Sequence, residues 1–117
     1  MVFDLPRLRW FLERARDSGA LGDARVYASI ALLRSERMAE RANQSLLGTP
    51  LPEDAYRRIA GGEGIDLAVE TAIALAAEPS VDALHVIPLG DERSAGQVAA
   101  AFRAASGAPV ERAGRLA

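Results

Sequence analysis

The residue types that could do chemistry are few in this chain, and the first of them is a lone histidine. His85 is the only histidine, and it stands inside the apolar run 83–89 without a second histidine or a pair of carboxylates nearby. A histidine in a strand could ligate a metal or act as a base, but either role needs partners of matching chemistry. We therefore expect a hydrogen-bonded structural histidine and no metal site. The chain has no cysteine, so thiolate ligands, thiol nucleophiles and disulfides are excluded as well.

Three further groups of polar residues admit a chemical interpretation beside a structural one. Arg34 and Ser35 stand where a strand is expected to turn into a helix, so they could bind an anion at the helix N-terminus; a simple cap by Ser35 is the favoured interpretation. Residues 61–64, with the sequence GGEG, superficially resemble a phosphate loop, but no strand precedes them and no Lys-Ser/Thr follows, which indicates a helix-to-helix turn. Glu53 and Asp54 open a helix, where adjacent acids usually complement the helix dipole.

The first helix is expected to begin after Asp4 and to pack through one side. Asp4 is an N-cap residue, and Pro6 lies in the first turn, where a missing N–H costs little. An apolar stripe recurs at helical spacing and consists of Leu8, Phe11, Leu12 and Ala15. Trp10 and Phe11 could stack a ligand, but packing against the sheet is the stronger expectation.

Helices and strands alternate along the rest of the chain. Two short apolar runs with β-branched members predict strands that are covered on both faces, at residues 25–32 and 83–89. Helices are expected at residues 36–43, 52–60, 65–77 and 94–105. A strand stub at 2–3 comes first, and the tail 108–117 is expected to be flexible. This order predicts an α/β fold with parallel strand connections.

Two strands and a stub are too few for a self-sufficient sheet. A sheet this narrow cannot shield its edges, and strands that are apolar on both faces need cover on both faces. The chain would therefore have to pair with strands supplied from elsewhere. The pattern alone predicts a segment of a larger sheet or barrel.

Composition bounds the class of protein. With 117 residues, of which 50% are hydrophobic, the chain has the size of one domain with a moderate core. Its formal net charge is -2 and its basic residues are spread along the sequence, so a nucleic-acid partner is not expected. The start of the chain lacks the pattern of a secretion signal, and no apolar run approaches the roughly 18 residues that cross a bilayer. We expect a cytoplasmic protein without a membrane partner.

Three segments resemble the C-terminal portion of methylenetetrahydrofolate reductases, in the same order. They are residues 2–4 (VFD), 29–35 (SIALLRS) with Met38-Ala39, and 83–89 (ALHVIPL). Residues 51–53 and the helix at 65–77 also match the family's spacing, so the resemblance covers residues 1–106. It implies that residues 1–107 form the last two to three βα units of a helix-rich, partial (βα)8 TIM barrel, followed by the flexible tail.

The resemblance also implies where ligands would bind, because chemistry in such barrels is built at the C-terminal ends of the strands. The family's substrate-binding positions fall on Met38, Ala42, Ile87 and Leu89. Leu89 matches the family's apolar lining, whereas the residue types at the other three positions differ from the better-known members. The family's general acid and most of its flavin contacts belong to earlier strands, and its Thr-Gln pair precedes the Phe-Asp segment. The resemblance therefore implies no catalytic residue in this chain.

The function implied by the resemblance is that of a flavoprotein oxidoreductase of one-carbon metabolism and methionine biosynthesis. Such enzymes use FAD and NAD(P)H to reduce 5,10-methylenetetrahydrofolate to 5-methyltetrahydrofolate, with the cofactor carrying the redox chemistry. This segment is expected to be inactive alone and to need the N-terminal half of the barrel or a homo-oligomer. The alternative is a non-catalytic half-barrel that binds another chain or self-associates through its unpaired strand edges.

Overall fold

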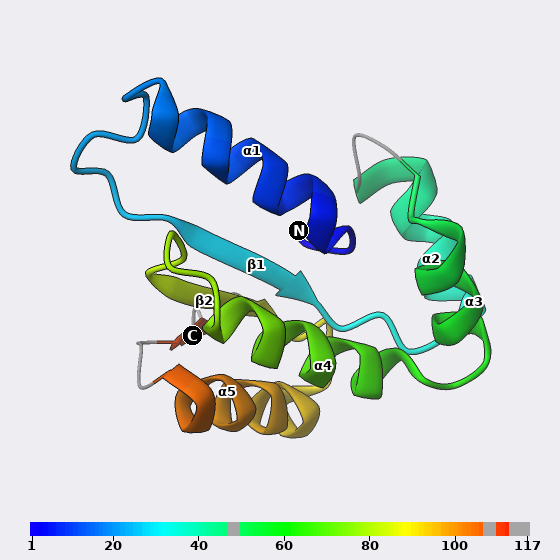
Figure 1. Cartoon of the computed structure of the whole chain (residues 1–117). Helices are drawn as coiled ribbons and strands as arrows, with labels where there is room; N and C mark the ends of the chain where they lie inside the picture. Colours follow the sequence, from blue (N-terminus) through cyan, green and yellow to red (C-terminus); the bar gives the residue numbers. More distant parts are fainter. Residues whose placement is uncertain (47–49, 107–109, 113–117) are drawn as a thin grey trace.

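Helices and strands alternate along the chain in the computed structural model, which describes residues 1–46, 50–106 and 110–112 (Figure 1). The elements follow in the order α1 (Leu5–Asp17), β1 (Tyr27–Ala31), α2 (Glu36–Arg41), the π-helical turn η1 (Ala42–Leu46), α3 (Glu53–Ala60), α4 (Gly64–Ala76), β2 (Ala83–Ile87), α5 (Glu92–Ser106) and β3 (Val110–Arg112). The predicted mixed α/β, helix-rich class is confirmed. The partial barrel stays a prediction.

Local side-chain chemistry sets where the helices begin. Asp4 Oδ1 accepts a hydrogen bond from the Arg7 N–H at 3.1 Å at the start of α1, and Ser35 Oγ accepts one from the Met38 N–H at 3.2 Å at the start of α2. Each bond satisfies a backbone donor that has no partner inside its own helix. Both predicted caps are confirmed, and so is the helix-to-helix turn at 61–64, which joins α3 to α4.

The strands form one parallel sheet in the order β1-β2-β3. In the register of β1 and β2, Ser29 lies beside His85 and Ile30 beside Val86. Because the two strands run in the same direction, the segments that follow them leave from the same edge of the sheet. The parallel connection predicted from the alternation of elements is thus confirmed.

Two segments beside the sheet differ from the sequence-based expectation. The expected stub at 2–3 is not a strand, but the Val2 N–H donates a hydrogen bond to the Ser29 carbonyl oxygen at 2.7 Å on the outer side of β1. At the opposite edge, residues 110–112 form β3 within the tail that the sequence predicts to be flexible. The other residues of that tail, 108–109 and 113–117, lie outside the described part of the chain.

The main core lies on one face of the sheet, which we call the covered face. Ile30 of β1 and Val86 of β2 are at most 1% exposed and pack in one cluster with Leu75 of α4 and Phe102 of α5. Leu8 of α1 packs against the same cluster. Figure 1 shows α4 and α5 side by side along the strands. Three helices thus bury their apolar sides against this face.

The opposite face, which we call the open face, has different surroundings. Side chains alternate between the two faces along a strand, so Tyr27, Ser29, His85 and Ile87 point away from the covered face. Tyr27 is 47% exposed and the other three are half-buried, whereas two alanines on the same face, Ala31 and Ala83, are at most 3% exposed. None of these residues belongs to either apolar cluster of the described residues. The strands therefore have an apolar helix layer on one face only in the described part of the chain.

The outer side of α1 corrects one expectation. Phe11, predicted to pack against the sheet, is 58% exposed, and its neighbour Trp10 is 59% exposed. The inward side is centred on Leu12, which is 2% exposed, and Arg9 forms an ion pair with Glu78 beyond the end of α4. Phe11 stands two positions after Arg9, and residues two positions apart on a helix point to nearly opposite sides. Because Arg9 reaches toward the end of α4, Phe11 faces away from α4. No described element covers that flank, which is why the aromatic ring is left outside.

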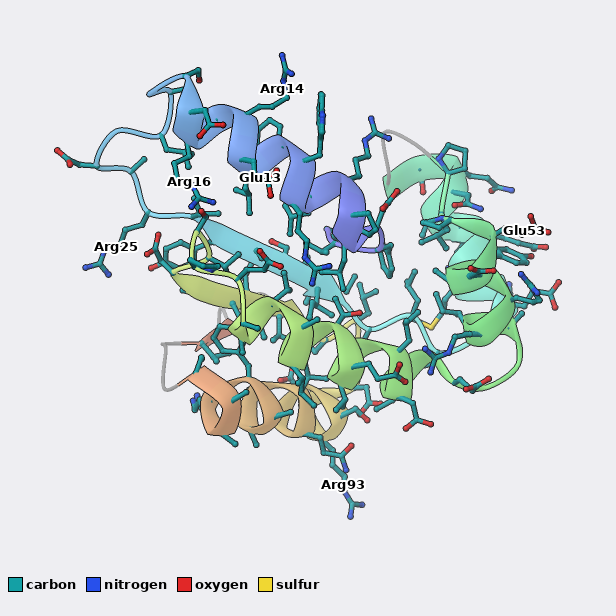
Figure 2. The ribbon with its side chains drawn as sticks, viewed as in Figure 1. Glu13, Arg14, Arg16, Arg25, Glu53 and Arg93 are labelled. Atoms are coloured by element: carbon teal, nitrogen blue, oxygen red, sulfur yellow. The ribbon has the colours of Figure 1, made fainter. Side chains whose placement is uncertain are left out.

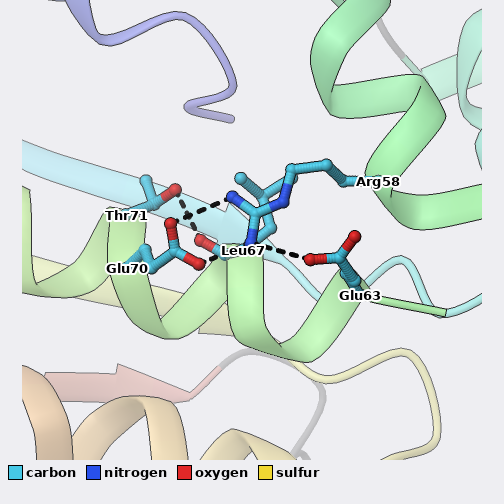
Figure 3. Close-up of polar contacts among 5 residues, drawn as sticks. All are labelled: Arg58, Glu63, Leu67, Glu70 and Thr71. Atoms are coloured by element: carbon cyan, nitrogen blue, oxygen red, sulfur yellow. Dashed lines mark hydrogen bonds and ion pairs between the residues drawn. The ribbon is translucent and has the colours of Figure 1, made fainter. Parts of the chain in front are cut away.

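An arginine fastens α3 to α4 (Figure 3). The Arg58 guanidinium donates to both carboxylate oxygens of Glu70, with Nη1–Oε1 at 2.9 Å, and its Nη2 also reaches Glu63 at 3.4 Å. The hydrogen bonds with Glu70 raise the pKa of Arg58 and lower the pKa of Glu70 below its ordinary value. This bidentate pair fixes the hairpin of α3 and α4 beside the end of β1.

Candidate functional site

The candidate site lies at the edge where β1 and β2 end. The loops at residues 32–35 and 88–91 leave from this edge, and ligands of open and closed parallel α/β sheets bind at such edges. The backbone pairing continues one step past β1, where the Leu32 N–H donates to the Ile87 carbonyl oxygen at 3.0 Å. The two loops therefore start side by side.

The loop after β2 is a tight turn with an unusual residue in it. The Asp91 N–H donates to the Pro88 carbonyl oxygen at 3.0 Å, and the two residues between them have positive φ angles, 50° at Leu89 and 92° at Gly90. This hydrogen bond and these φ angles are those of a type I′ turn. A leucine in the left-handed region costs about 1–2 kcal/mol relative to glycine. Leu89 is the one non-glycine residue with positive φ among the described residues, so strain is concentrated at a predicted site position.

Arg34 connects the loop after β1 to this turn. Its Nη2 donates to the Leu89 carbonyl oxygen at 2.8 Å, and its Nη1 lies 3.7 Å from Asp91 Oδ2. Asp91 in turn accepts a hydrogen bond from the Ser94 N–H at 3.0 Å at the start of α5. The hydrogen bonds from Ser94, followed by the positive charges of Arg34 and Arg93, hold the pKa of Asp91 below its ordinary value. The guanidinium considered as an anion ligand is thus bound to the chain's own carbonyl and carboxylate groups.

Three of the four predicted substrate-binding residues meet in a second apolar cluster at this edge. Its buried members are Leu33, Ala39, Ala42, Leu51 and Ile59, with Phe3, Met38, Tyr56, Leu67 and Leu89 packed against them. Met38 and Leu89 are half-buried, whereas Ala42 is only 1% exposed and lies inside the cluster. Ile87 stands apart from these three, on the open face at the end of β2. Their role in binding stays a prediction.

The helix that carries Met38 is held to α3 by a tyrosine. The Tyr56 hydroxyl lies within hydrogen-bonding distance of Glu40 Oε1 at 3.2 Å and of Glu36 Oε1 at 3.3 Å, both on α2. Burial and the negative charges of Glu36 and Glu40 raise the pKa of Tyr56 above its ordinary value. The phenol therefore stays protonated and keeps donating to α2 at neutral pH.

The predicted helix at 36–43 changes its geometry where Ala42 stands. The α-helical hydrogen bonding ends at Arg41, and residues 42–46 form a π-helical turn. The Asn43 side-chain oxygen accepts a hydrogen bond from the Leu51 N–H at 2.7 Å, which fixes the chain that returns from this turn. Single π turns are frequent at functional sites, and this one lies in the candidate site.

A glycine allows α4 to approach the loop after β1. A Cβ atom added to Gly64 would lie 1.9 Å from the Leu33 carbonyl oxygen and 3.3 Å from the Arg34 Cα. No side chain fits into this space, so the first turn of α4 supports the loop directly through its backbone. The sequence shows this glycine only as part of the turn at 61–64.

Among the described residues, the cavity at this edge is too small for a flavin ring. The cavity under the end of β1, lined among others by Phe3, Ala31, Leu33 and Leu67, has about 10 Å³. This is about the space of one water molecule, whereas ligand pockets hold about 300–1,000 Å³. An isoalloxazine ring does not fit there, and we derive no chemical step through FAD from these residues.

His85 has the partner that a structural histidine needs. Its Nδ1 lies 3.1 Å from Ser29 Oγ across the two paired strands, on the open face. In the described ranges, no three His, Asp or Glu side chains are placed so that they could hold a metal ion together. The arrangement is that of a hydrogen-bonded polar pair on a sheet face.

Comparisons with known proteins assign the chain to no family. No protein-family model, no curated protein and no solved structure matches the chain. The resemblance to methylenetetrahydrofolate reductases therefore remains a prediction from short ordered segments. Among the described residues, no helix has the length and apolar character needed to cross a membrane.

Proposed function

We propose that this chain forms the last βα units of a (βα)8 barrel in a flavin-dependent oxidoreductase similar to methylenetetrahydrofolate reductase. In that role it supplies part of the wall that holds the folate and the nicotinamide of NAD(P)H. The reaction is the reduction of 5,10-methylenetetrahydrofolate to 5-methyltetrahydrofolate, and FAD supplies the hydride-transfer chemistry when it is bound. The residues that bind FAD and transfer protons come from the remainder of the barrel.

The contrast between the two sheet faces carries this proposal. In a (βα)8 barrel the helices lie outside and the inner face of each strand packs against side chains of the other strands. A complete open parallel sheet instead has helices on both faces. Here Val86 points into a helix layer, whereas His85 and Ile87 of the same strand point to a face on which the described residues form no helix layer. This arrangement is the one expected of a barrel segment whose inner face would pack against the side chains of further strands.

The residues at the carboxyl edge suit a binding wall better than a catalytic centre. Met38 and Leu89 offer apolar surface in one cluster, and Ile87 offers a separate apolar side chain at the end of β2. Arg34 holds the Leu89 carbonyl oxygen, so it orients the turn that presents the leucine side chain. No described acid stands free among these residues, since Asp91 caps α5 and faces Arg34. The chain would therefore bind and orient substrate and exclude water.

Co-expression tests the proposal directly. The full chain is produced together with an N-terminal half of a methylenetetrahydrofolate reductase barrel, and the purified complex is examined for flavin absorbance and nicotinamide oxidation. We expect a yellow complex that oxidises NADH or NADPH when methylenetetrahydrofolate is present. Leu89→Asp is expected to keep the flavin but raise the KM for folate, whereas the exposed Glu53→Gln serves as the matched control.

The alternative function gives a different result in the same experiment. A non-catalytic half-barrel module would form a complex, with itself or with the added half, that contains no flavin and oxidises no nicotinamide. Such an outcome with every N-terminal half tried would contradict the enzyme assignment. It would leave the chain as an interaction module.

A further inference from the structure

The flank of α1 that faces away from α4 carries an unusual exposed surface. Trp10 and Phe11 expose more than half of their side chains there, and Arg7, Arg14 and Asp17 follow the same side at helical spacing. We call these five residues the aromatic flank. Large exposed aromatic side chains that are rimmed by charges are typical of protein interfaces.

The aromatic flank is hollowed beside its rings. An open hollow of about 670 Å³ is lined by Trp10, Phe11, Arg14, Ala15, Asp17, Ser18 and Ala20. The Arg14 guanidinium lies over the Trp10 ring, 4.9 Å from its centroid, in a cation–π contact that orders both side chains. Figure 2 shows Arg14 extending outward from α1. The surface therefore combines a preordered aromatic residue with a space that could receive another.

The charges of the aromatic flank are complementary to themselves. When two α1 helices run antiparallel about a two-fold axis at the level of Leu12, Arg7 of each helix lies level with Asp17 of the other, because both stand five positions from Leu12. Trp10 of each helix then lies level with Arg14 of the other and with the hollow beside it. In the described ranges, the exposed side chains of Arg7 and Asp17 form no ion pair within the chain.

We propose that the aromatic flank is an interface between two copies of this chain, in which the two α1 helices pack antiparallel around a two-fold axis. An isologous interface of this kind uses the same patch twice, so each complementary pair occurs twice. Two Arg7–Asp17 ion pairs close the ends, and each Trp10 enters the hollow of the other copy. This inference goes beyond the proposed function, because it requires neither flavin nor folate nor the rest of a barrel.

Sedimentation velocity of the full chain over a series of concentrations tests the interface. We expect a reversible dimer for the unmodified protein. Trp10→Ala removes two central contacts at once and is expected to weaken the dimer about 100-fold or more. Arg93→Asp on α5, which Figure 2 shows pointing away from the protein at a distance from α1, is the control that leaves the dimer unchanged. A monomer at every concentration would overturn the proposal.

Charge reversal tests the antiparallel register. Arg7→Asp and Asp17→Arg each place like charges opposite one another, and each is expected to weaken self-association about tenfold. The two variants mixed together, or both changes in one chain, restore opposite charges at both ends and are expected to restore the dimer. Neither change disfavours α1, since an acid near its start and a base near its end suit the helix dipole. Dimers that ignore the single reversals, or that the mixture does not restore, would refute this register.

Discussion

Neighbouring residues of the same two strands have opposite surroundings in this protein. Ile30 and Val86 point into the covered face and are at most 1% exposed, whereas Ser29 and His85, one position earlier, are half-buried on the open face. The covered face forms a buried hydrophobic core with apolar side chains from three helices. The open face has a single polar pair and no helix layer in the described residues. The apolar packing of the described residues is thus concentrated on one face of the sheet.

The loops at the carboxyl edge join these two regions. Gly64 of α4, a helix of the covered face, supports the loop after β1, and Asp91 caps α5 at the end of the loop after β2. Arg34 then ties one loop to the other. The candidate site is therefore positioned by the covered face.

The largest loss of stability is expected from a substitution in the covered face. Phe102→Ala removes a fully buried ring between α5 and the sheet and should lower the free energy of unfolding by about 3–5 kcal/mol. Ile87→Ala on the open face is the matched change and should cost about 1 kcal/mol or less, because its side chain is only half-buried. Urea unfolding of the full chain measures both. Equal costs would mean that the two faces do not differ as described.

The second largest loss of stability is expected at Gly64, where α4 supports the candidate site. Gly64→Ala places a methyl group 1.9 Å from the Leu33 carbonyl oxygen, so α4 or the loop must shift, at a cost of about 3 kcal/mol. Gly61→Ala in the same turn meets its nearest atom, the Arg57 carbonyl oxygen, only at 3.3 Å and should cost less than about 1 kcal/mol. The two variants are compared by urea unfolding and by circular dichroism. A harmless Gly64→Ala would show that the helix does not support the loop.

A smaller loss of stability is expected when the contacts of Arg34 between the two loops are removed. Arg34→Met keeps the length of the side chain but removes the hydrogen bond to Leu89 and the ion pair with Asp91, and should cost about 1 kcal/mol. Arg37→Met, three positions later on the exposed side of α2, is the control and should change little. Amide exchange of the turn at 88–91 is expected to quicken in the first variant only. Unchanged exchange would argue against a positioning role for Arg34.

Much of the fold follows from local patterns, and the exceptions have a common physical cause. The caps at Asp4 and Ser35 and the apolar alternation of the two main strands are local signals, so they predict the elements well. By contrast, β3 has only three residues and owes its hydrogen bonds to β2, and the exposure of Phe11 depends on a neighbour that α1 lacks on one side. Contacts that are distant along the chain decide such cases.

The candidate site was predictable to a lesser degree. The resemblance, and not any pattern of spacing, pointed to Met38, Ala42 and Leu89, and the structure brings these three into one cluster. The sequence does not reveal the strained turn, because a leucine gives no sign of a positive φ angle. It also does not reveal the hydrogen bond from Arg34 to the Leu89 carbonyl oxygen, 55 positions along the chain. Backbone conformation and long-range pairing lie beyond what residue types alone predict.

The smallest effect is a dependence on pH that should arise where the turn meets α5. The pKa of Asp91 is lowered in the folded protein by its hydrogen bonds from Ser94 and then by Arg34, so its ionised form favours folding. This contribution is present above the unfolded pKa of about 3.9 and is lost as the pH falls through the lower folded pKa. Asp91→Asn keeps a capping side chain without the charge. It should therefore be less stable than the unmodified protein at pH 7, and the difference should vanish at strongly acidic pH.

Unfolding by urea over a range of pH values measures this difference. Asp54→Asn is the control, because the Asp54 side chain is 92% exposed and, within the described residues, pairs only with Arg57, whose side chain is 70% exposed. Its stability difference from the unmodified protein should stay small at every pH, about 0.5 kcal/mol or less, because the exposed charge contributes only to the helix dipole and a surface ion pair. If the Asp91→Asn difference were the same at neutral and acidic pH, the carboxylate would act as a neutral cap only. The tie between Arg34 and the turn would then rest on the Leu89 carbonyl oxygen alone.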